Sequence, residues 1–246
     1  MSLPLVFEAM GTAVSLRTAS GLPDEAATAV RDAFRVLEDR FSLWLPTSEA
    51  SRLARREITL THTSREFRSV YDQAVSWREA TRGAFTPHRP DGTVDLSGIV
   101  KALAIRDSGR ALAQAGIHDW CLNAGGDVLV DGAQASGEPW VVGIVDPQQR
   151  EAMLSQFVSS PGRRAVATSG TAERGEHVWR VGADDTFVQV SVCAADIVSA
   201  DVLATAILAG GPATLELAQD LADIDVLACT PGERIWASAA FLTEAA

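Results

Sequence analysis

The N-terminal half of the chain carries apolar residues at helical spacing. From Asp24 they recur at the i, i+3, i+4 intervals of one buried stripe, formed by Ala26, Val30, Ala33, Phe34, Leu37 and Phe41. Thr63-Ser64-Arg65-Glu66 has the form of a capping box, which predicts a second helix that ends at Gly83 and buries Phe67, Val70, Tyr71, Ala74 and Trp77. A third helix is predicted over residues 98–114, ending at Gly116.

The C-terminal half carries shorter apolar runs, which are typical of strands. Gly, Pro and Asp turns separate such runs at residues 119–131, 140–145, 164–168, 177–181 and 186–193. Two more helices are predicted at 199–209 and 213–222, before a hairpin of 225–229 with 234–239. Residues 5–16 predict a strand that enters and leaves a tight site at Met10-Gly11-Thr12. Because helices and strands are grouped more than they alternate, we expect an α+β fold, with a mixed or antiparallel sheet and flanking helices.

Composition limits the class of protein. A chain of 246 residues with 47% hydrophobic residues can build one sizeable domain or two tightly joined ones. No apolar run approaches the roughly 20 residues that span a bilayer, and the first residues lack the basic and apolar regions of a signal peptide. We therefore expect a cytoplasmic protein without membrane insertion. Three widely spaced cysteines, Cys121, Cys193 and Cys229, predict buried reduced thiols.

The net charge of −11 constrains the ligand. Nucleic-acid backbones are bound through clustered Lys and Arg, so this balance argues against such a partner. An anionic ligand such as a pyrophosphate needs local compensation from a divalent cation, a helix N-terminus or a placed Lys or Arg. The sequence offers candidates for all three.

Two pairs of polar residues can supply that compensation. Asp95 precedes the helix predicted at 98–114, whose first amides or carbonyls can reach a phosphate or a metal, and the alternative is that Asp95 is an N-cap. Lys101 lies further along that helix and is by default a solvated surface residue. Asp201 and Thr205 are four residues apart, so a carboxylate and a hydroxyl share one helical face. Such oxygen ligands suit Mg²⁺, while a Thr bonded back to its own helix is the alternative.

Several apolar residues can line a flat ligand or can belong to the core. Trp44, in the loop after the first predicted helix, either closes the core or stacks on a ring. Met10 carries a flexible thioether beside a glycine that permits close backbone approach. Phe85 follows the helix end at Gly83 and is most simply a buried side chain. The run Asn123-Ala124-Gly125-Gly126-Asp127 predicts a turn or bulge between strands.

Together, in order, these segments resemble the ApbE-type flavin transferase family, the FAD:protein FMN transferases. The resemblance is carried by Ala9-Met10-Gly11-Thr12, Gly83-Ala84-Phe85-Thr86-Pro87, Val94-Asp95-Leu96-Ser97-Gly98-Ile99-Val100-Lys101, the Asn123 run, Ala167-Thr168-Ser169-Gly170 and Ala200-Asp201-Val202-Leu203-Ala204-Thr205-Ala206. The Trp44 loop fits the family's Ser-x-aromatic-x-Pro-x-Ser-Glu pattern. This chain has Thr86 where the family has Asp, and His177 lacks the Asp-Pro that follows it in the family. Eight residues separate Thr86 from Asp95, where the family has several tens.

The resemblance implies a single ApbE-like domain over residues 1–246 and a set of site residues. Mg²⁺ is expected on Asp201, Thr205 and the Gly98 carbonyl. Lys101 is expected to stabilise developing charge, and His177 is a candidate general base by residue type. The residues expected to bind FAD are Met10, Trp44, Ala84, Phe85, Thr86, Asp95, Lys101 and Val178.

The implied activity is Mg²⁺-dependent transfer of FMN from FAD to a Thr or Ser hydroxyl of a client protein, with release of AMP. Two alternatives stay open. One is a metal-dependent FAD hydrolase, in which water replaces the client hydroxyl. The other is a non-catalytic flavin-binding protein, which is favoured by Thr86, by the missing Asp-Pro and by the short segment before Asp95. The sequence names neither the client nor the oligomeric state.

Overall fold

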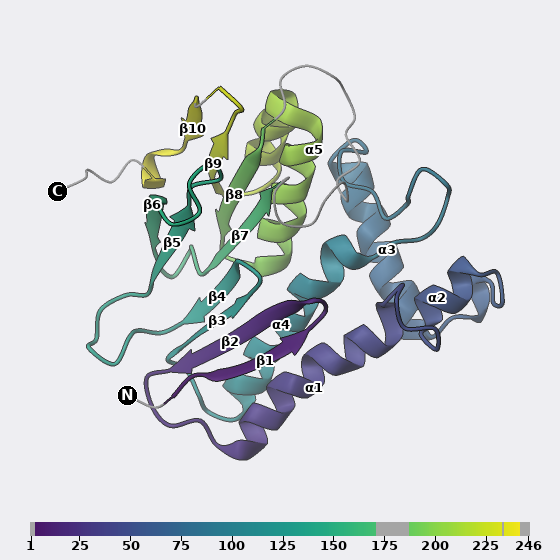
Figure 1. The fold of residues 1–246 in the computed structure, drawn as a ribbon, viewed down its shortest axis with the longest axis horizontal. Coiled ribbons are helices and arrows are strands. Elements are labelled where there is room, and N and C mark those ends of the chain that lie inside the picture. Colours follow the sequence, from purple (N-terminus) through teal and green to yellow (C-terminus); the bar gives the residue numbers. More distant parts are fainter. Residues whose placement is uncertain (1–2, 171–186, 233, 242–246) are drawn as a thin grey trace.

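An eight-stranded antiparallel sheet forms the centre of the structure (Figure 1). The computed structural model describes residues 3–170, 187–232 and 234–241. Within them the strands of the sheet lie in the order β1-β2-β3-β4-β7-β8-β9-β10, and β5 and β6 form a separate hairpin. The bounds are β1 Leu5–Ala9, β2 Thr12–Thr18, β3 Trp120–Ala124, β4 Asp127–Asp131, β5 Val141–Val145, β6 Met153–Val158, β7 Ala165–Gly170, β8 Gln189–Ala194, β9 Asp225–Cys229 and β10 Ile235–Ala237. The predicted α+β class is confirmed.

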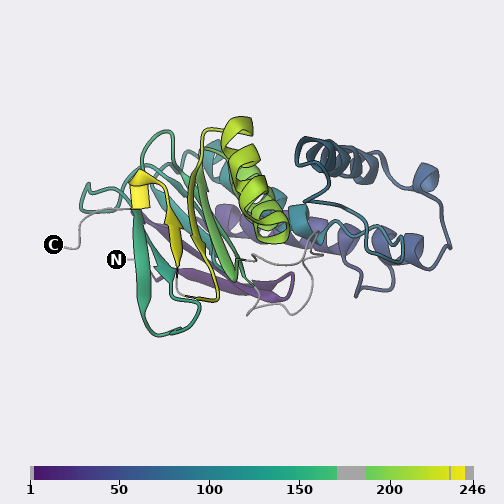
Figure 2. The same cartoon turned by 90° about the horizontal axis from the view of Figure 1, so that it is seen from above.

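Helices α1, α4 and α5 cover one face of this sheet, while α2 and α3 extend beyond its edge (Figures 1 and 2). The helices are α1 Asp24–Phe41, α2 Glu49–Ala54, α3 Arg65–Ala80, α4 Ser97–Gln114 and α5 Ile197–Leu221, with short 3₁₀ turns η1 Leu60–His62 and η2 Ala239–Phe241. The stripe predicted from Asp24 is the buried face of α1, where Val30 and Phe34 are fully buried. α4 begins within one residue of its predicted start.

Both faces of the sheet are covered where β7, β8 and β9 pair. Successive residues of a strand point to opposite faces. Ala167 and Val192 therefore belong to the main core beneath the helices, whereas Val166 and Cys193 belong to a second cluster with Phe157 of the β5–β6 hairpin. The sheet is thus buried on both sides beside the strand ends that carry the predicted site.

α5 passes through the core as one long kinked helix. Gly211 has a non-helical φ of 68° and ψ of −155° and is followed by Pro212, so α5 consists of two helices that meet at a kink, in agreement with the two helices predicted at 199–209 and 213–222. By length and composition α5 could cross a membrane, so the expectation that no segment is long and apolar enough is wrong. In its most apolar window, 72% of the residues are buried inside the protein, as in a core helix.

The start of α3 differs from the predicted capping box. Ser64, one residue after Thr63, is the N-cap, and its hydroxyl accepts a hydrogen bond from the Phe67 amide at 3.1 Å. In a capping box the N-cap amide donates to a Glu three residues later, as predicted for Glu66. Here the Ser64 amide donates instead to the carboxylate of Glu49 in α2, which is distant in sequence.

Some elements were not predicted, and of two predicted strands one lies wholly and the other partly outside the described residues. α2 and β6 have no counterpart in the sequence prediction. Residues 119–131 form the β3–β4 hairpin, with its turn at Gly125-Gly126, where φ is 61° and 92°. The strand predicted at 177–181 lies outside the described residues, and the one at 186–193 corresponds to β8.

The three cysteines are free, as predicted. Cys193 and Cys229 are buried and Cys121 is half-buried. Burial raises the pKa of the Cys121 thiol to about 11 and that of Cys229 to about 11. These thiols are therefore protonated at neutral pH and belong to the packing.

Candidate functional site

The sequence motifs meet at one edge of the sheet. Met10-Gly11 joins β1 to β2 there, Gly125-Gly126 joins β3 to β4, and β7 ends there at Gly170. Because neighbouring strands are antiparallel, the end of one strand and the start of the next fall at the same edge. The Gly125 amide donates to the Ala13 carbonyl at 3.2 Å, and a Cβ at Gly125 would lie 2.4 Å from the Thr12 hydroxyl. The two turns are therefore in contact.

Met10 holds an unusual backbone conformation in the first turn. Its φ of 51° lies in the left-handed region that favours glycine. For a non-glycine residue this costs on the order of 1–3 kcal/mol, and such residues cluster at functional sites. The Met10 amide donates to the Glu38 carboxylate of α1 at 3.0 Å, which holds the turn in place. The thioether is half-buried against the main core.

Lys101 is buried and forms an ion pair with Asp127. Lys101 is 7% exposed and Asp127 is fully buried. The other carboxylate oxygen of Asp127, Oδ1, accepts a hydrogen bond from the Thr168 amide at 3.1 Å. The interpretation of Lys101 as a solvated surface residue is therefore wrong. Asp127 was not predicted as a site residue, although its place directly after the Gly-Gly turn is the signal that could have found it.

The residues predicted to bind a metal lie on α5 and at the start of α4. Asp201 is 6% exposed, and the Thr205 hydroxyl lies 3.0 Å from the Ser169 hydroxyl of β7. Thr205 thus contacts a neighbouring strand through its side chain. Among the described residues, no three His, Cys, Asp or Glu side chains are grouped as metal ligands. A cation here would therefore depend on one carboxylate together with hydroxyl and main-chain oxygens.

Ala84 and Phe85 lie between the first turn of α4 and α5. The Phe85 amide donates to the Thr81 hydroxyl at 3.1 Å, which fixes the chain after α3. A Cβ at Gly98 would lie 3.1 Å from the Phe85 ring, and a Cβ at Gly210 would lie 3.1 Å from Ala84. Phe85 is 4% exposed, so most of its ring packs in the core next to the site. The close approach explains the glycine at position 98.

A short hairpin connects Thr86 to Asp95. The Asp95 amide donates to the Pro87 carbonyl at 2.9 Å, and the His88 amide donates to the Thr86 hydroxyl at 3.2 Å. His88 also packs edge-on against Tyr71 of α3, with its Nε2 3.1 Å from the phenol oxygen. Burial, assisted by nearby Arg78, lowers the pKa of His88, so its imidazole is neutral at pH 7. The hairpin is thus tied to α3.

Arg89 of this hairpin binds Asp95. Its Nε and Nη2 lie 2.8 Å and 2.7 Å from Asp95 Oδ2, and Asp95 Oδ1 accepts a hydrogen bond from the Ser97 amide at 3.0 Å. Leu96 is the N-cap of α4, so the alternative that Asp95 is the N-cap is wrong by one residue. Burial acts to raise the pKa of Asp95, but the Ser97 hydrogen bonds and Arg89 outweigh it and hold the pKa below its ordinary value. Arg89 was not predicted as a site residue, because no motif in the neighbouring sequence identifies Asp95 as its partner.

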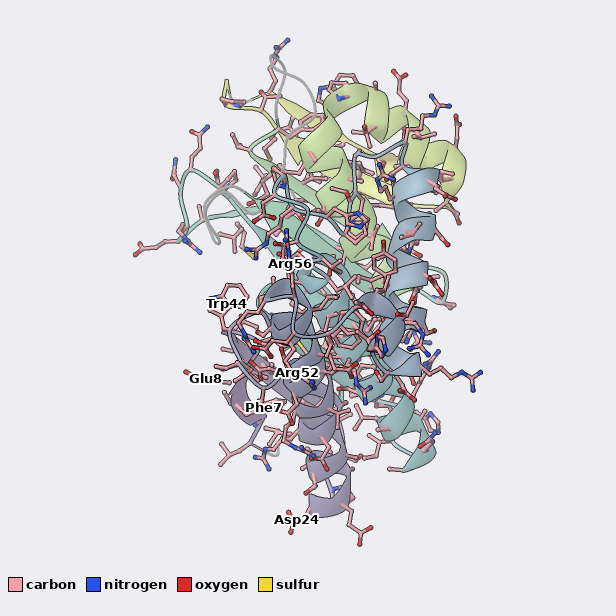
Figure 3. The ribbon with its side chains drawn as sticks, turned by 90° about the vertical axis from the view of Figure 1, so that its right-hand side faces the viewer. Phe7, Glu8, Asp24, Trp44, Arg52 and Arg56 are labelled. Atoms are coloured by element: carbon pink, nitrogen blue, oxygen red, sulfur yellow. The ribbon has the colours of Figure 1, made fainter. Side chains whose placement is uncertain are left out.

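Trp44 is exposed, so the interpretation that it closes the core is wrong. It is 71% exposed. Figure 3 shows its indole at the rim of the molecule, pointing away from the helices. A large exposed aromatic side chain on a short loop is available to cover a ligand.

Two predicted site residues, His177 and Val178, lie outside the described residues.

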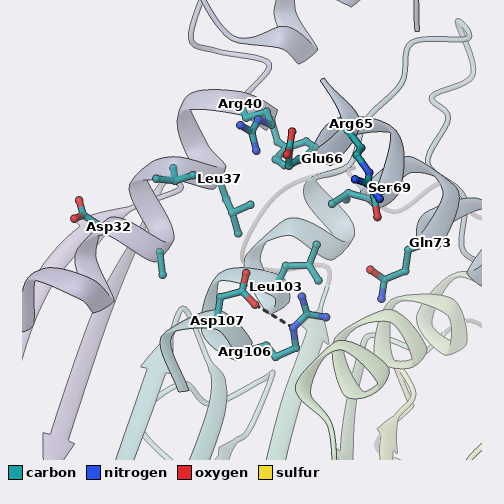
Figure 4. A pocket seen from close by; sticks show the side chains of 14 residues that line it. Asp32, Leu37, Arg40, Arg65, Glu66, Ser69, Gln73, Leu103, Arg106 and Asp107 are labelled. Carbon is teal, nitrogen blue, oxygen red and sulfur yellow. Dashed lines mark hydrogen bonds and ion pairs between the residues drawn. The ribbon is translucent and has the colours of Figure 1, made fainter. Parts of the chain in front are cut away.

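A cavity of about 640 Å³ lies between α1, α3 and α4 (Figure 4), and none of the predicted site residues lines it. A smaller one of about 110 Å³ reaches the site edge, because Gly126, Thr168 and Gly170 contribute to its lining. The contacts described above bring Lys101, Gly98, Thr205 and the Met10 turn to the region of one sheet edge.

Comparisons with known proteins match most of the chain to one family. The sequence model of the ApbE family matches residues 10–89 and 86–228. A FAD:protein FMN transferase of Klebsiella pneumoniae is 29% identical over 169 residues, which are 63% of this chain and 48% of that protein. One from Salmonella typhimurium is 34% identical over 82 residues, 33% of this chain and 23% of that protein. The match thus spans about half the length of the first relative and less of the second.

Solved structures show the same fold. The flavinyl transferase ApbE of Pseudomonas stutzeri matches with a TM-score of 0.79 and 16% identity, covering 97% of this chain and 96% of that one. The ApbE protein of Thermotoga maritima matches with a TM-score of 0.78 and 20% identity, covering 98% and 99%. At these identities the likeness concerns the fold. The family match extends over most of the chain and includes the motifs at the sheet edge, and the chain therefore belongs to the ApbE family.

Proposed function

We propose that this chain is a FAD:protein FMN transferase. The observation that carries the proposal is that segments distant in sequence place Lys101, Asp127, Ser169 and Thr205 around one sheet edge, linked by the contacts of Asp127 with Thr168 and of Ser169 with Thr205. Membership of the ApbE family and the activity named for the curated relatives support it.

In the proposed reaction, a Thr or Ser hydroxyl oxygen of a client protein bonds to the phosphorus on the FMN side of the FAD pyrophosphate. The bond from this phosphorus to the bridging oxygen breaks, and AMP leaves with that oxygen. The hydroxyl proton passes to a base, for which His177 is the candidate by residue type. FMN remains on the client through a phosphodiester. Such a transfer depends mainly on positioning and on charge stabilisation.

The residues of the site fit these two tasks. The Lys101 ammonium has three N–H donors, and its ion pair with Asp127 fixes its direction without using all of them. Asp127 is itself held by the Thr168 amide. The hydroxyls of Ser169 and Thr205 add donors from β7 and α5. Donors that are held before the substrate arrives need no reorganisation when charge develops on the phosphate.

We also propose that Mg²⁺ binds through Asp201, Thr205 and the Gly98 carbonyl. The donor set fits, since carboxylate, hydroxyl and carbonyl oxygens are hard ligands and Mg²⁺ keeps waters and substrate phosphates as its remaining ligands. Asp201 lies one helical turn before Thr205 and is buried. When bound, the cation neutralises pyrophosphate charge, which matters in a protein with a net charge of −11.

The test is incubation of the purified protein with FAD, Mg²⁺ and a Thr-containing acceptor protein, followed by mass measurement of the acceptor and analysis of the nucleotides. An increase equal to one FMN group together with AMP supports the transferase. AMP and free FMN without that increase identify a hydrolase. FAD binding without either product identifies a flavin-binding protein, and both of these results overturn the proposal.

A further inference from the structure

An exposed indole on a flexible loop would lose much of its binding free energy to ordering of the loop. Trp44 is 71% exposed, yet two serine side chains at the start of α2, directly after the loop that carries it, are buried. Ser48 is 1% exposed and Ser51 is 3% exposed, which is unusual for serine beside a surface loop. Their hydrogen bonds explain the burial.

Ser42 lies at the centre of these hydrogen bonds. Its hydroxyl oxygen accepts from the amides of Trp44 and Leu45, at 3.1 Å and 3.2 Å. Its carbonyl accepts from the Ser48 hydroxyl and, at 3.1 Å, from the Ser51 hydroxyl. Ser42 also ends α1, because its amide donates to the Glu38 carbonyl. The residue therefore fastens both sides of the Trp44 loop to the end of one helix.

The far end of the loop is fastened independently. Glu49, the first residue of α2, makes an ion pair with Arg40 of α1 at 3.2 Å and accepts the Ser64 amide at the start of α3. The Arg55 guanidinium donates to the Pro46 carbonyl at 2.7 Å. Three helices thus hold a loop whose largest side chain faces water.

We propose that Ser42, assisted by Ser48 and Ser51, is a positioning residue that holds Trp44 ready to cover FAD. The proposal rests on the proposed function and on the role of FAD-binding residue that the family resemblance implies for Trp44. Helix capping accounts for part of the network, since the Ser48 hydroxyl also caps α2 through the Ser51 amide at 3.0 Å. Capping does not account for the Ser42 hydroxyl, because both of its donors are amides of the loop and one is the Trp44 amide itself.

The experiment is a double-mutant cycle of Ser42→Ala and Trp44→Ala, with FAD affinity measured by calorimetry on the whole chain. In the presence of Trp44, loss of the two hydrogen bonds is expected to weaken FAD binding by roughly three- to tenfold. In the Trp44→Ala background the same change should weaken it by less than about twofold, since the loop then has no indole to hold. Ser76→Ala is the matched control, because its hydroxyl only bonds back to Asp72 within α3.

Equal losses in both backgrounds would overturn the proposal, since Ser42 would then act on folding or on another part of the site. If Ser42→Ala does not fold, Ser42→Cys takes its place in the same cycle, because a thiol is a much weaker acceptor than the hydroxyl for the amides of Trp44 and Leu45. A wild-type protein that does not bind FAD refutes the proposed function itself. A protein that binds FAD with additive losses refutes only the role of Ser42.

Discussion

Replacement of Lys101 by Met tests the buried ion pair at the site. Met has a similar length, so the cavity left by Lys101→Met is small and the change removes mainly the charge. In Lys101→Met, the fully buried Asp127 loses its charged partner. Of its described polar contacts, the hydrogen bond from the Thr168 amide then remains. Removing one partner of a buried pair typically costs about 3–5 kcal/mol in the free energy of unfolding. For a chain of this size that corresponds to a fall in Tm of about 6–20 °C.

The assay is urea unfolding followed by tryptophan fluorescence, which reports the core through the buried Trp120. Arg110→Met is the control on the same helix, because the pair of Arg110 with Asp107 is exposed and is expected to contribute about 0–1 kcal/mol. The double variant Lys101→Met with Asp127→Asn should be more stable than Lys101→Met alone, since Asn still accepts the Thr168 amide and carries no charge. A loss below about 1 kcal/mol for Lys101→Met, or a double variant less stable than the single one, would refute the reasoning.

Three further predictions follow from the site. Trp44→Ala should weaken FAD binding by about 1–3 kcal/mol while leaving the apo Tm nearly unchanged, and an unfolded variant would show instead that the indole has a structural role. FAD should bind more tightly than FMN, and EDTA should weaken FAD binding in calorimetry; equal affinities unaffected by EDTA would contradict a dinucleotide site with a cation. The folded state lowers the pKa of Asp95, so its contribution to stability is present above the ordinary pKa and is lost as pH falls toward the folded value. Asp95→Asn should therefore flatten the acid side of the pH–stability profile, whereas an unchanged profile would show that Asp95 is not involved.

The regular elements were predictable where one face of a segment is buried. The stripe from Asp24 repeats at the helical period because α1 buries one face against α4 and the sheet, so the sequence carries the signal. α2 has only six residues, which is too short for a repeated stripe. β6 was missed because Ser155 and Gln156 interrupt its apolar residues.

The partners of the site residues were not predictable from sequence periodicity. Lys101 binds Asp127 only because α4 packs behind the β3–β4 hairpin, and Arg89 reaches Asp95 only because the hairpin between them is tight. Trp44 would be assigned to the core by its hydrophobicity. The loop that exposes it is bonded to Ser42 through the amides of Trp44 and Leu45, and hydrogen bonds to main-chain groups leave no periodic pattern in the sequence.

The central claim is that the edge formed by α4, β7 and α5 is where FMN is transferred, and Asp201→Asn tests it most directly. Wild-type protein, Asp201→Asn and Asp220→Asn are each given FAD, Mg²⁺ and a Thr-containing acceptor, and the rate at which the acceptor gains the mass of one FMN group is measured. Asp220 lies on the same helix but is exposed, so it controls for the loss of one negative charge. We expect wild type and Asp220→Asn to label the acceptor at similar rates and Asp201→Asn to lose nearly all labelling while remaining folded. Labelling by Asp201→Asn at the wild-type rate would contradict the account and place the transfer site elsewhere.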